Sequence, residues 1–239
     1  MATYVLVHGA WHGGWCWQKV KALLEAQGHR VFTPTKTGLG ERAHLMSGTI
    51  TMDTLVEDIA NVIRYEDLHE VILVGHSFGG TVISGVAEKV KERLRGLIYL
   101  DAAILENGES MFSQMPEEIV AERKALALES SNGLSLPVPN AKALGLLKDA
   151  HWDFVKARLT PQPLSTYDTP ISLNALPGQG LPCRYIVCTQ PLYEPLAWAR
   201  ERAKAYGWEI IKLSTGHDAM VSDPEGLVAL LAPKDSVLH

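Results

Sequence analysis

The chain has 239 residues, of which 46% are hydrophobic and 21% are charged, a balance that is typical of a globular protein and excludes general disorder. With 22 basic and 27 acidic residues the net charge is -5, and no Lys/Arg-rich run is present, so no nucleic-acid partner is expected. The sequence has no stretch of about 18 apolar residues and no signal-peptide pattern at its N-terminus, so no membrane span is expected.

Short apolar runs rich in β-branched residues alternate with helical patterns along the chain. The runs are nearly continuous in apolar character, as in parallel strands that are covered on both faces. Strands are expected at Thr3–His8, Arg30–Pro34, Val71–Gly75, Gly96–Asp101, Cys183–Thr189 and Glu209–Leu213. Helices are expected at Gln18–Ala26, at Thr51–Tyr65 with Thr51 as N-cap, at Thr81–Lys91, and after Asp223-Pro224-Glu225. This alternation predicts a doubly wound α/β sheet.

One stretch breaks the alternation, because roughly 80 residues separate Asp101 from Cys183. Helical patterns cover Glu117–Glu129, Asn140–Lys148 and His151–Leu159, and a proline-punctuated segment follows them. A structureless loop of this length is improbable in a compact domain. We therefore expect one domain over residues 1–239, with residues 103–181 inserted as a helical lid at one end of the sheet.

The strongest chemical signal is the Gly-x-Ser-x-Gly pattern formed by Gly75, Ser77 and Gly79. A buried strand precedes it and a helical pattern follows it, which is the context of a nucleophile elbow. The two glycines remove side chains that would clash in the sharp turn, and the helix N-terminus favours a developing negative charge. Ser77 is therefore the candidate nucleophile.

Two further segments fit a serine nucleophile. The glycine-rich loop His8–Trp15 follows the first strand and by itself could be a plain turn, but beside Ser77 it favours an oxyanion hole. Its donors would be the backbone N–H groups of Ala10 and of Phe78, the residue after the nucleophile. His217 follows the last strand, where it can reach Ser77 as general base.

The chain resembles α/β-hydrolases of the hydroxynitrile-lyase and methyl-esterase branch, which includes salicylate-binding-protein-like enzymes and small bacterial esterases. The resemblance spans essentially the whole chain and rests on the motifs VHGAWHGGWCW, GHSFGG, LTPQPL…PISL, RYIVCTQ and GHDAMVSDPEGL. It implies an α/β-hydrolase fold with a six-stranded, mostly parallel sheet, helices on both faces, and a helical cap after the fourth strand. It also implies small-ester hydrolysis without a cofactor, and it makes a homodimer through the lid one option.

Two positions distinguish lyases from esterases within this branch. Lyases that resemble this chain usually have Thr after the first His-Gly and Lys directly after the catalytic His, whereas this chain has Ala10 and Asp218. No cation stands beside His217 to stabilise cyanide. The resemblance therefore favours an esterase.

The acid that would orient His217 is ambiguous. In relatives it usually follows Cys-Thr-Gln or Cys-Thr-Glu, but here Pro191 follows Cys188-Thr189-Gln190 and cannot accept a hydrogen bond through its side chain. Asp101, at a strand end from which some α/β-hydrolases supply the acid, is the preferred substitute. Glu194 in the same loop as Pro191 is the second option, and a site without a conventional acid is the third.

The sequence thus predicts a serine carboxylesterase that hydrolyses small, largely apolar esters through an acyl-enzyme. Trp11 and Phe78 are candidate pocket walls, and Trp152, with Leu146 and Phe154, could cover the pocket or pack in the core. A hydroxynitrile-lyase-like or other C–C lyase, and a ligand-binding protein derived from a hydrolase, are the alternatives. The three cysteines, Cys16, Cys183 and Cys188, are odd in number and lack metal-ligand spacing, so we expect free thiols and no metal. Free thiols indicate a reducing compartment, and the cytoplasm is the expected location. No cofactor is expected.

Overall fold

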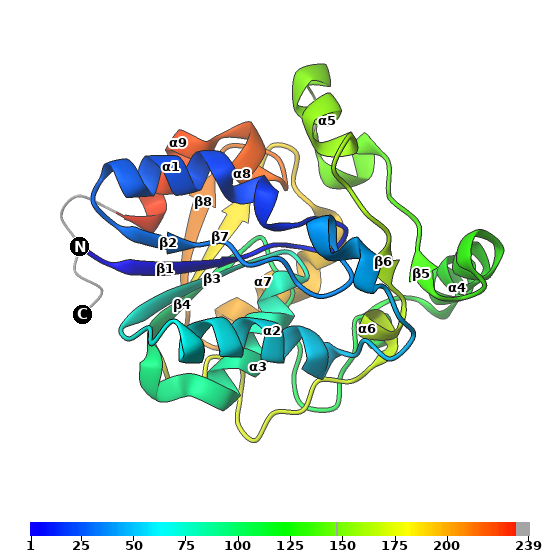
Figure 1. The fold of residues 1–239 in the computed structure, drawn as a ribbon, viewed down its shortest axis with the longest axis horizontal. Coiled ribbons are helices and arrows are strands. Elements are labelled where there is room, and N and C mark those ends of the chain that lie inside the picture. Colours follow the sequence, from blue (N-terminus) through cyan, green and yellow to red (C-terminus); the bar gives the residue numbers. More distant parts are fainter. Residues whose placement is uncertain (147, 233–239) are drawn as a thin grey trace.

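The computed structural model describes residues 1–146 and 148–232. Its centre is a six-stranded sheet in the order β2-β1-β3-β4-β7-β8, in which neighbouring strands are parallel (Figure 1). The strands are β1 (Thr3–Val7), β2 (Arg30–Phe32), β3 (Val71–His76), β4 (Leu94–Leu100), β7 (Cys183–Cys188) and β8 (Glu209–Leu213). Each expected strand is present, with ends that shift by up to two residues.

Helices cover both faces of this sheet (Figure 1). On one face lie α1 (Gln18–Ala26), α8 (Ala219–Ser222) and α9 (Pro224–Leu231), and on the other lie α2 (Met52–Tyr65), α3 (Gly79–Val90) and α7 (Ala197–Ala205). Strand β1 feeds both cores, since Tyr4 and Leu6 pack with the α1 side while Val5 and Val7 pack with the α2 side. Burial on both faces explains why the strands are apolar throughout rather than alternating.

Two helices illustrate what the sequence pattern can and cannot predict. The expected N-cap of α2 is confirmed, because the Thr51 hydroxyl accepts the Thr54 N–H while the Thr54 hydroxyl accepts the Thr51 N–H. Helix α7 was not expected, because its sequence is rich in charged residues and its buried positions are Ala199, Arg200 and Ala203. Small buried residues give no apolar stripe from which to predict a helix.

The strand order places the loop that follows β1 beside the loop that follows β3. Strand β1 lies between β2 and β3, so the chain moves outward in one direction from β1 to β2 and then crosses back to place β3 on the other side of β1. Ligands of open α/β sheets bind beyond the carboxyl ends of the strands at such a switch point. The loops that follow β1 and β3 here begin at His8 and at Ser77.

Between β4 and β7, the helices and strands lie at one end of the sheet, on the right of Figure 1, and the chain then returns past α2 and α3 through residues 169–174. This stretch contains α4 (Glu117–Ser131), β5 (Ser135–Leu136), α5 (Asp149–Lys156), β6 (Gln162–Pro163) and α6 (Ser165–Asp168). The antiparallel pairing of β5 with β6 joins its two halves. We call residues 103–181 the insert.

One helix expected in the insert is wrong. Instead of a helix over Asn140–Lys148, the structure has a 3₁₀ turn, η5 (Ala141–Leu144), and residue 147 lies outside the described residues. Gly145 follows at φ 68°, a left-handed conformation that ends a helix. The remaining 3₁₀ turns are η1 (Gly14–Trp17), η2 (Gly40–Leu45), η3 (Lys91–Arg93), η4 (Phe112–Gln114) and η6 (Glu194–Leu196).

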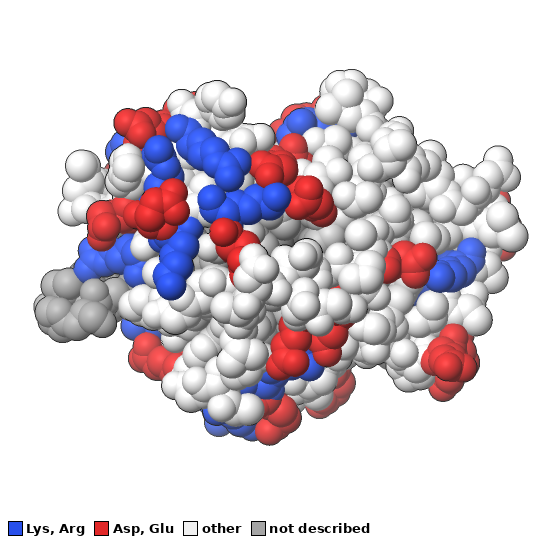
Figure 2. Space-filling view, turned by 90° about the horizontal axis from the view of Figure 1, so that it is seen from below, with Lys and Arg blue, Asp and Glu red and all other residues white. Residues whose placement is uncertain are grey.

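Figure 2 shows the molecule from the side of α2 and α3, with charged side chains of both signs interspersed over the sheet region and fewer over the insert. Among the described helices, none is long and apolar enough to cross a bilayer.

Candidate active site

Ser77 occupies the sharp turn between β3 and α3. Its φ is 53°, in the left-handed region that a serine rarely adopts, so the turn holds its backbone in a strained conformation. The turn is too tight for side chains at its flanks, because a Cβ on Gly75 would lie 2.6 Å from the Gly79 carbonyl oxygen and one on Gly79 would lie 2.7 Å from the Val7 oxygen. This geometry presents the Ser77 hydroxyl at the end of the sheet.

His217 lies in the loop between β8 and α8 and reaches Ser77 across the sheet end. Its Nε2 is 2.9 Å from Ser77 Oγ. The His76 ring holds the loop by donating from Nε2 to the His217 carbonyl oxygen at 3.0 Å. The Tyr193 ring stacks on the imidazole, with ring centroids 3.9 Å apart and planes at 16°. Sequence analysis did not single out Tyr193, and no motif marks it.

Asp101 meets the other nitrogen of His217. Its Oδ2 lies 2.7 Å from His217 Nδ1, and its side chain is fully buried. Strands β3 and β4 are paired so that His76 is opposite Leu100, and the next residues, Ser77 and Asp101, therefore leave the sheet side by side. Glu194, the second candidate, is elsewhere, because its carboxylate pairs with Arg200 at 3.3 Å and is 74% exposed.

A small cavity of about 10 Å³ lies among these groups. Its walls include Ala10, Trp11, Ser77 and His217. A volume of this size accommodates about one water molecule or one oxygen atom of a substrate. The expected N–H donors belong to Ala10, in this wall, and to Phe78, at the first residue before α3.

A larger cavity of about 320 Å³ extends from Ser77 under the insert. Its walls are mainly apolar or aromatic and come from the insert, from Trp11 and from the segment after β7. The lining residues are Trp11, Ser77, Met111, Gln114, Met115, Pro116, Ile119, Arg123, Tyr167, Tyr193, Pro195, Leu196 and Trp198. This volume matches a small organic substrate.

Arg123 is the single cation in this wall, and the sequence did not distinguish it from the other charged residues of α4. Its guanidinium donates a hydrogen bond to the Tyr167 hydroxyl. No carboxylate lines the cavity, and within residues 1–146 and 148–232 no ion pair involves Arg123. The cavity therefore offers a positively charged donor to an acceptor group on a ligand.

Of the two roles expected for Trp152, pocket cover or core packing, the structure shows core packing. It lines neither cavity at Ser77 and instead packs against the core on the α1 side of the sheet. Helix α5 directs its apolar residues to that side, where the Phe154 ring meets the Trp15 ring edge-on at 5.7 Å. Leu146 is also buried in this core. The walls that the insert contributes to the larger cavity come instead from residues 111–123 and from Tyr167 in α6.

Asp218, directly after His217, forms a buried pair with His12. The His12 ring donates from Nδ1 to the Ala10 carbonyl oxygen at 2.7 Å, and its Nε2 lies 3.1 Å from Asp218 Oδ2. Both nitrogens thus face acceptors, so the ring carries both protons. Burial lowers the pKa of His12, but the Asp218 carboxylate outweighs burial and raises the pKa above its usual value.

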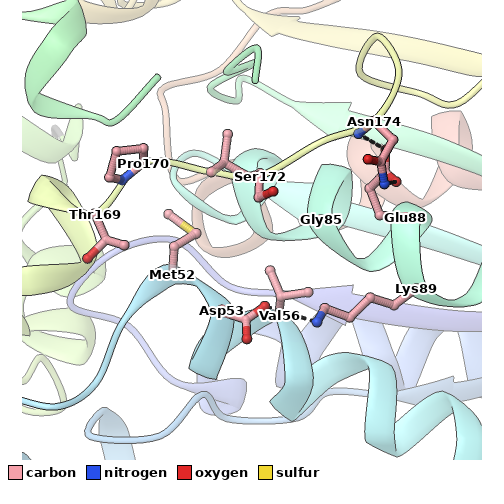
Figure 3. A pocket seen from close by; sticks show the side chains of 11 residues that line it. Met52, Asp53, Val56, Gly85, Glu88, Lys89, Thr169, Pro170, Ser172 and Asn174 are labelled. Atoms are coloured by element: carbon pink, nitrogen blue, oxygen red, sulfur yellow. Dashed lines mark hydrogen bonds and ion pairs between the residues drawn. The ribbon is translucent and has the colours of Figure 1, made fainter. Parts of the chain in front are cut away.

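A third cavity, of about 330 Å³, lies between α2, α3 and residues 169–174 (Figure 3). It shares no lining residue with the two cavities at Ser77. Its charged groups already have partners, since Lys89 pairs with Asp53 at 2.9 Å and Glu88 accepts the Asn174 backbone N–H, also at 2.9 Å. We assign no function to it.

The fold and the arrangement at Ser77 agree with the family comparison. A model of the alpha/beta hydrolase family matches residues 4–230, and the chain belongs to this family. The chain is 41% identical to a carbendazim hydrolyzing esterase of Nocardioides sp. (strain SG-4G), over 97% of this chain and 99% of that protein.

A second sequence relative and a solved structure are also similar to this chain. The chain is 37% identical to putative methylesterase 11 of Arabidopsis thaliana, over 61% of this chain and 39% of that protein. Its fold is similar to the solved structure of an extracellular alpha/beta-hydrolase from a Paenibacillus species, with a TM-score of 0.85 at 23% identity, over 97% of this chain and 98% of the other. The expected α/β-hydrolase fold is confirmed.

Proposed function

We propose that the protein is a serine carboxylesterase that cleaves small, largely apolar esters through an acyl-enzyme. The supporting observation is the continuous contact from Asp101 Oδ2 to His217 Nδ1 at 2.7 Å and from His217 Nε2 to Ser77 Oγ at 2.9 Å. A hydroxyl, an imidazole and a buried carboxylate in this order are the parts of a nucleophilic triad. The relationship to a carbendazim hydrolyzing esterase also favours ester hydrolysis.

In the first step, Ser77 Oγ attacks the ester carbonyl while His217 Nε2 takes the hydroxyl proton. A C–O bond forms to Oγ, and the carbonyl electrons move onto oxygen. Asp101 holds the Nδ1 proton of His217 and stabilises the imidazolium. When the tetrahedral intermediate collapses, the alcohol leaves and takes the proton back from Nε2.

In the second step, water attacks the acyl-enzyme, with His217 again as the general base. The acid product is released and Ser77 Oγ recovers its proton. In both steps, the negative oxygen would occupy the small cavity beside Ala10, where the N–H groups of Ala10 and Phe78 are the proposed donors. The insert acts as a lid that excludes water from the larger cavity.

The carbon–carbon or cyanohydrin lyase alternative is not favoured. Lyases that resemble this chain usually have a lysine directly after the catalytic histidine to stabilise cyanide, whereas Asp218 is a fully buried carboxylate bound to His12. Release of cyanide from mandelonitrile would support the lyase instead. A binding protein would retain its ligand without turnover.

The proposal predicts a covalent adduct at Ser77. A fluorophosphonate should inactivate the enzyme and add its phosphonyl mass to the peptide that contains Ser77. With p-nitrophenyl acetate and butyrate we expect a burst of p-nitrophenol followed by steady turnover, and carbendazim should be assayed beside them. A folded protein with neither adduct nor turnover would contradict the proposal.

The guanidinium of Arg123, which has no carboxylate partner among the described residues, predicts a preference for esters that carry an acceptor or anionic group. A hydrogen bond to a charged group contributes about 1.5–3 kcal/mol, so Arg123→Gln should lower kcat/KM for mono-p-nitrophenyl glutarate by about tenfold or more. For neutral p-nitrophenyl butyrate the change should stay within about twofold. The matched control is Lys124→Gln, because the neighbouring Lys124 pairs with Asp168 at 3.0 Å. Equal effects on both esters would refute this role.

The cytoplasmic location and the homodimer, two expectations from the sequence, stay predictions. The described thiols of Cys16, Cys183 and Cys188 are free, which agrees with a reducing compartment such as the cytoplasm. The second expectation is that two copies of the chain pair through the lid.

A further inference from the structure

Lys36 lies fully buried between the two segments that we propose as the oxyanion hole. Its side chain has no exposed surface, and no ion pair involves it in the described parts of the chain. A buried ammonium without a carboxylate partner is costly and therefore uncommon. Its surroundings compensate with carbonyl groups and an aromatic face.

The ammonium contacts the loop after β1 through two backbone carbonyls. Nζ donates to the His8 oxygen at 2.7 Å and to the Gly9 oxygen at 3.4 Å. The His8 ring accepts the Lys36 backbone N–H at Nε2, 3.1 Å away, so its proton is on Nδ1, which donates to the Gly9 oxygen at 2.8 Å. The Gly9 carbonyl is therefore held by two donors.

This hold on the carbonyl fixes the direction of the Ala10 N–H. The Gly9 C=O and the Ala10 N–H belong to one planar peptide group, in which a trans bond points them in opposite directions. Donors on the Lys36 side of the carbonyl thus turn the N–H away from Lys36. Ala10 and Ser77 line the same small cavity, and Lys36 is not among its lining residues.

The same ammonium also meets the second segment. Nζ lies over the Phe78 ring, 4.9 Å from its centroid, an arrangement that is attractive between a cation and an aromatic face. The Phe78 ring also stacks on the Tyr167 ring, with centroids 5.3 Å apart and planes at 2°. Lys36 therefore contacts both proposed donor residues: the peptide group that carries the Ala10 N–H, and the Phe78 ring.

We propose that Lys36 is a positioning residue that holds the Gly9–Ala10 peptide and Phe78 in the geometry needed to bind the oxyanion. Its positive charge also polarises the Gly9–Ala10 peptide and strengthens its N–H as a donor. This inference rests on the proposed serine esterase chemistry. Lys36 does not touch the substrate, and it acts through Ala10 and Phe78.

The charge of Lys36 is sensitive to pH near neutrality. Burial lowers the pKa of its ammonium to about 7, although Cys16 and Asp58 act to raise it. The other titratable groups that face it are His8 and His12, in the loop after β1. Burial, followed by the charge of Lys36, lowers the pKa of His8 well below its usual value, so His8 stays neutral, whereas His12 is held protonated by Asp218. Asp58 is itself bound by Arg42 at 3.2 Å.

The test compares Lys36→Met, which keeps the length of the side chain without charge or donors, with the wild type on one activated ester. Loss of an oxyanion donor costs about 10²–10³ in kcat, so a weakened donor should cost about 10-fold or more. KM should change by less than about twofold. The wild-type kcat should fall as the pH rises through about 7 and Lys36 loses its proton, and this fall should be absent in the variant. Lys204→Met, at an exposed lysine, is the matched control.

A second readout separates this proposal from the esterase itself. The ¹H–¹⁵N shifts of the Ala10 and Phe78 amides should titrate with Lys36 in the wild type and lose this titration in Lys36→Met. If the wild type shows no turnover, the esterase proposal fails and the amide shifts alone decide the role of Lys36. If Lys36→Met does not fold, Lys36→Gln and the wild-type amide titration decide it. Unchanged kcat with an unchanged pH profile, or amides that do not titrate, would overturn the proposal.

Discussion

Ser77→Ala should lower kcat for p-nitrophenyl ester hydrolysis by about 10⁶-fold, the size of the loss expected when the nucleophile of a serine triad is removed. The residual rate, about 10³–10⁴ above that in water, would come from substrate binding and from the N–H donors. The measurement is steady-state turnover together with the burst: the burst should disappear, and turnover should fall to this residual rate. The small side chain of alanine should leave the fold intact.

The matched control is Ser172→Ala, because Ser172 is an exposed serine that lines the separate cavity of Figure 3. This variant should keep the wild-type kcat and react with a fluorophosphonate at the normal rate. A Ser77→Ala enzyme that retains full activity would show that another nucleophile operates, and the acyl-enzyme mechanism would have to be abandoned.

Asp101→Asn should reduce kcat by about 10⁴-fold while leaving the site geometry nearly unchanged. The asparagine amide can turn its NH₂ group toward His217 Nδ1, which then becomes an acceptor. The ring proton moves to Nε2, which can no longer accept the Ser77 hydroxyl proton. Because the effect is on the chemical step, KM should change much less than kcat.

Glu194→Gln provides the comparison, since this exposed carboxylate pairs with Arg200 and should be replaceable without loss of activity. A loss in Glu194→Gln with normal activity in Asp101→Asn would reverse the assignment of the acid. Normal activity in both variants would mean that His217 works without a carboxylate.

Much of the fold could be predicted from the sequence because its strands are buried on both faces. Runs such as Val71–Gly75 have a single physical interpretation once helical patterns flank them. The Ser77 turn was predictable for a similar reason, since only glycines fit the contacts at Gly75 and Gly79. The choice between Asp101 and Glu194 was open because it depends on strand pairing, and the adjacency of β3 to β4 appears only in three dimensions.

The insert could be predicted only in outline. The pattern of α5 contains apolar residues at helical spacing, but it does not say which neighbour they meet, and Trp152 turned to the α1 side instead of the pocket. Lys36 and Arg123 were missed because a single cation in a sequence is most often exposed. Their importance arises from partners that are distant in the chain, such as Phe78 for Lys36 and Tyr167 for Arg123.

The buried pair of His12 and Asp218 joins two loops of the site. It connects the loop that carries Ala10 with the loop that carries His217, across 206 positions of sequence. Burial would raise the pKa of Asp218, but His12 outweighs burial and lowers it, while the pKa of His12 is raised. The contribution of Asp218 to stability is thus lost as the pH falls through its lowered value, and that of His12 is lost as the pH rises through its raised value.

Both contributions are complete between the unfolded-state values of about 3.9 and about 6.5. Outside that window the pair weakens, and the oxyanion loop and the histidine loop lose the same anchor together. Extreme pH should therefore weaken the loop that carries Ala10 and the loop that carries His217 at once, so that local unfolding of the two loops follows a single curve.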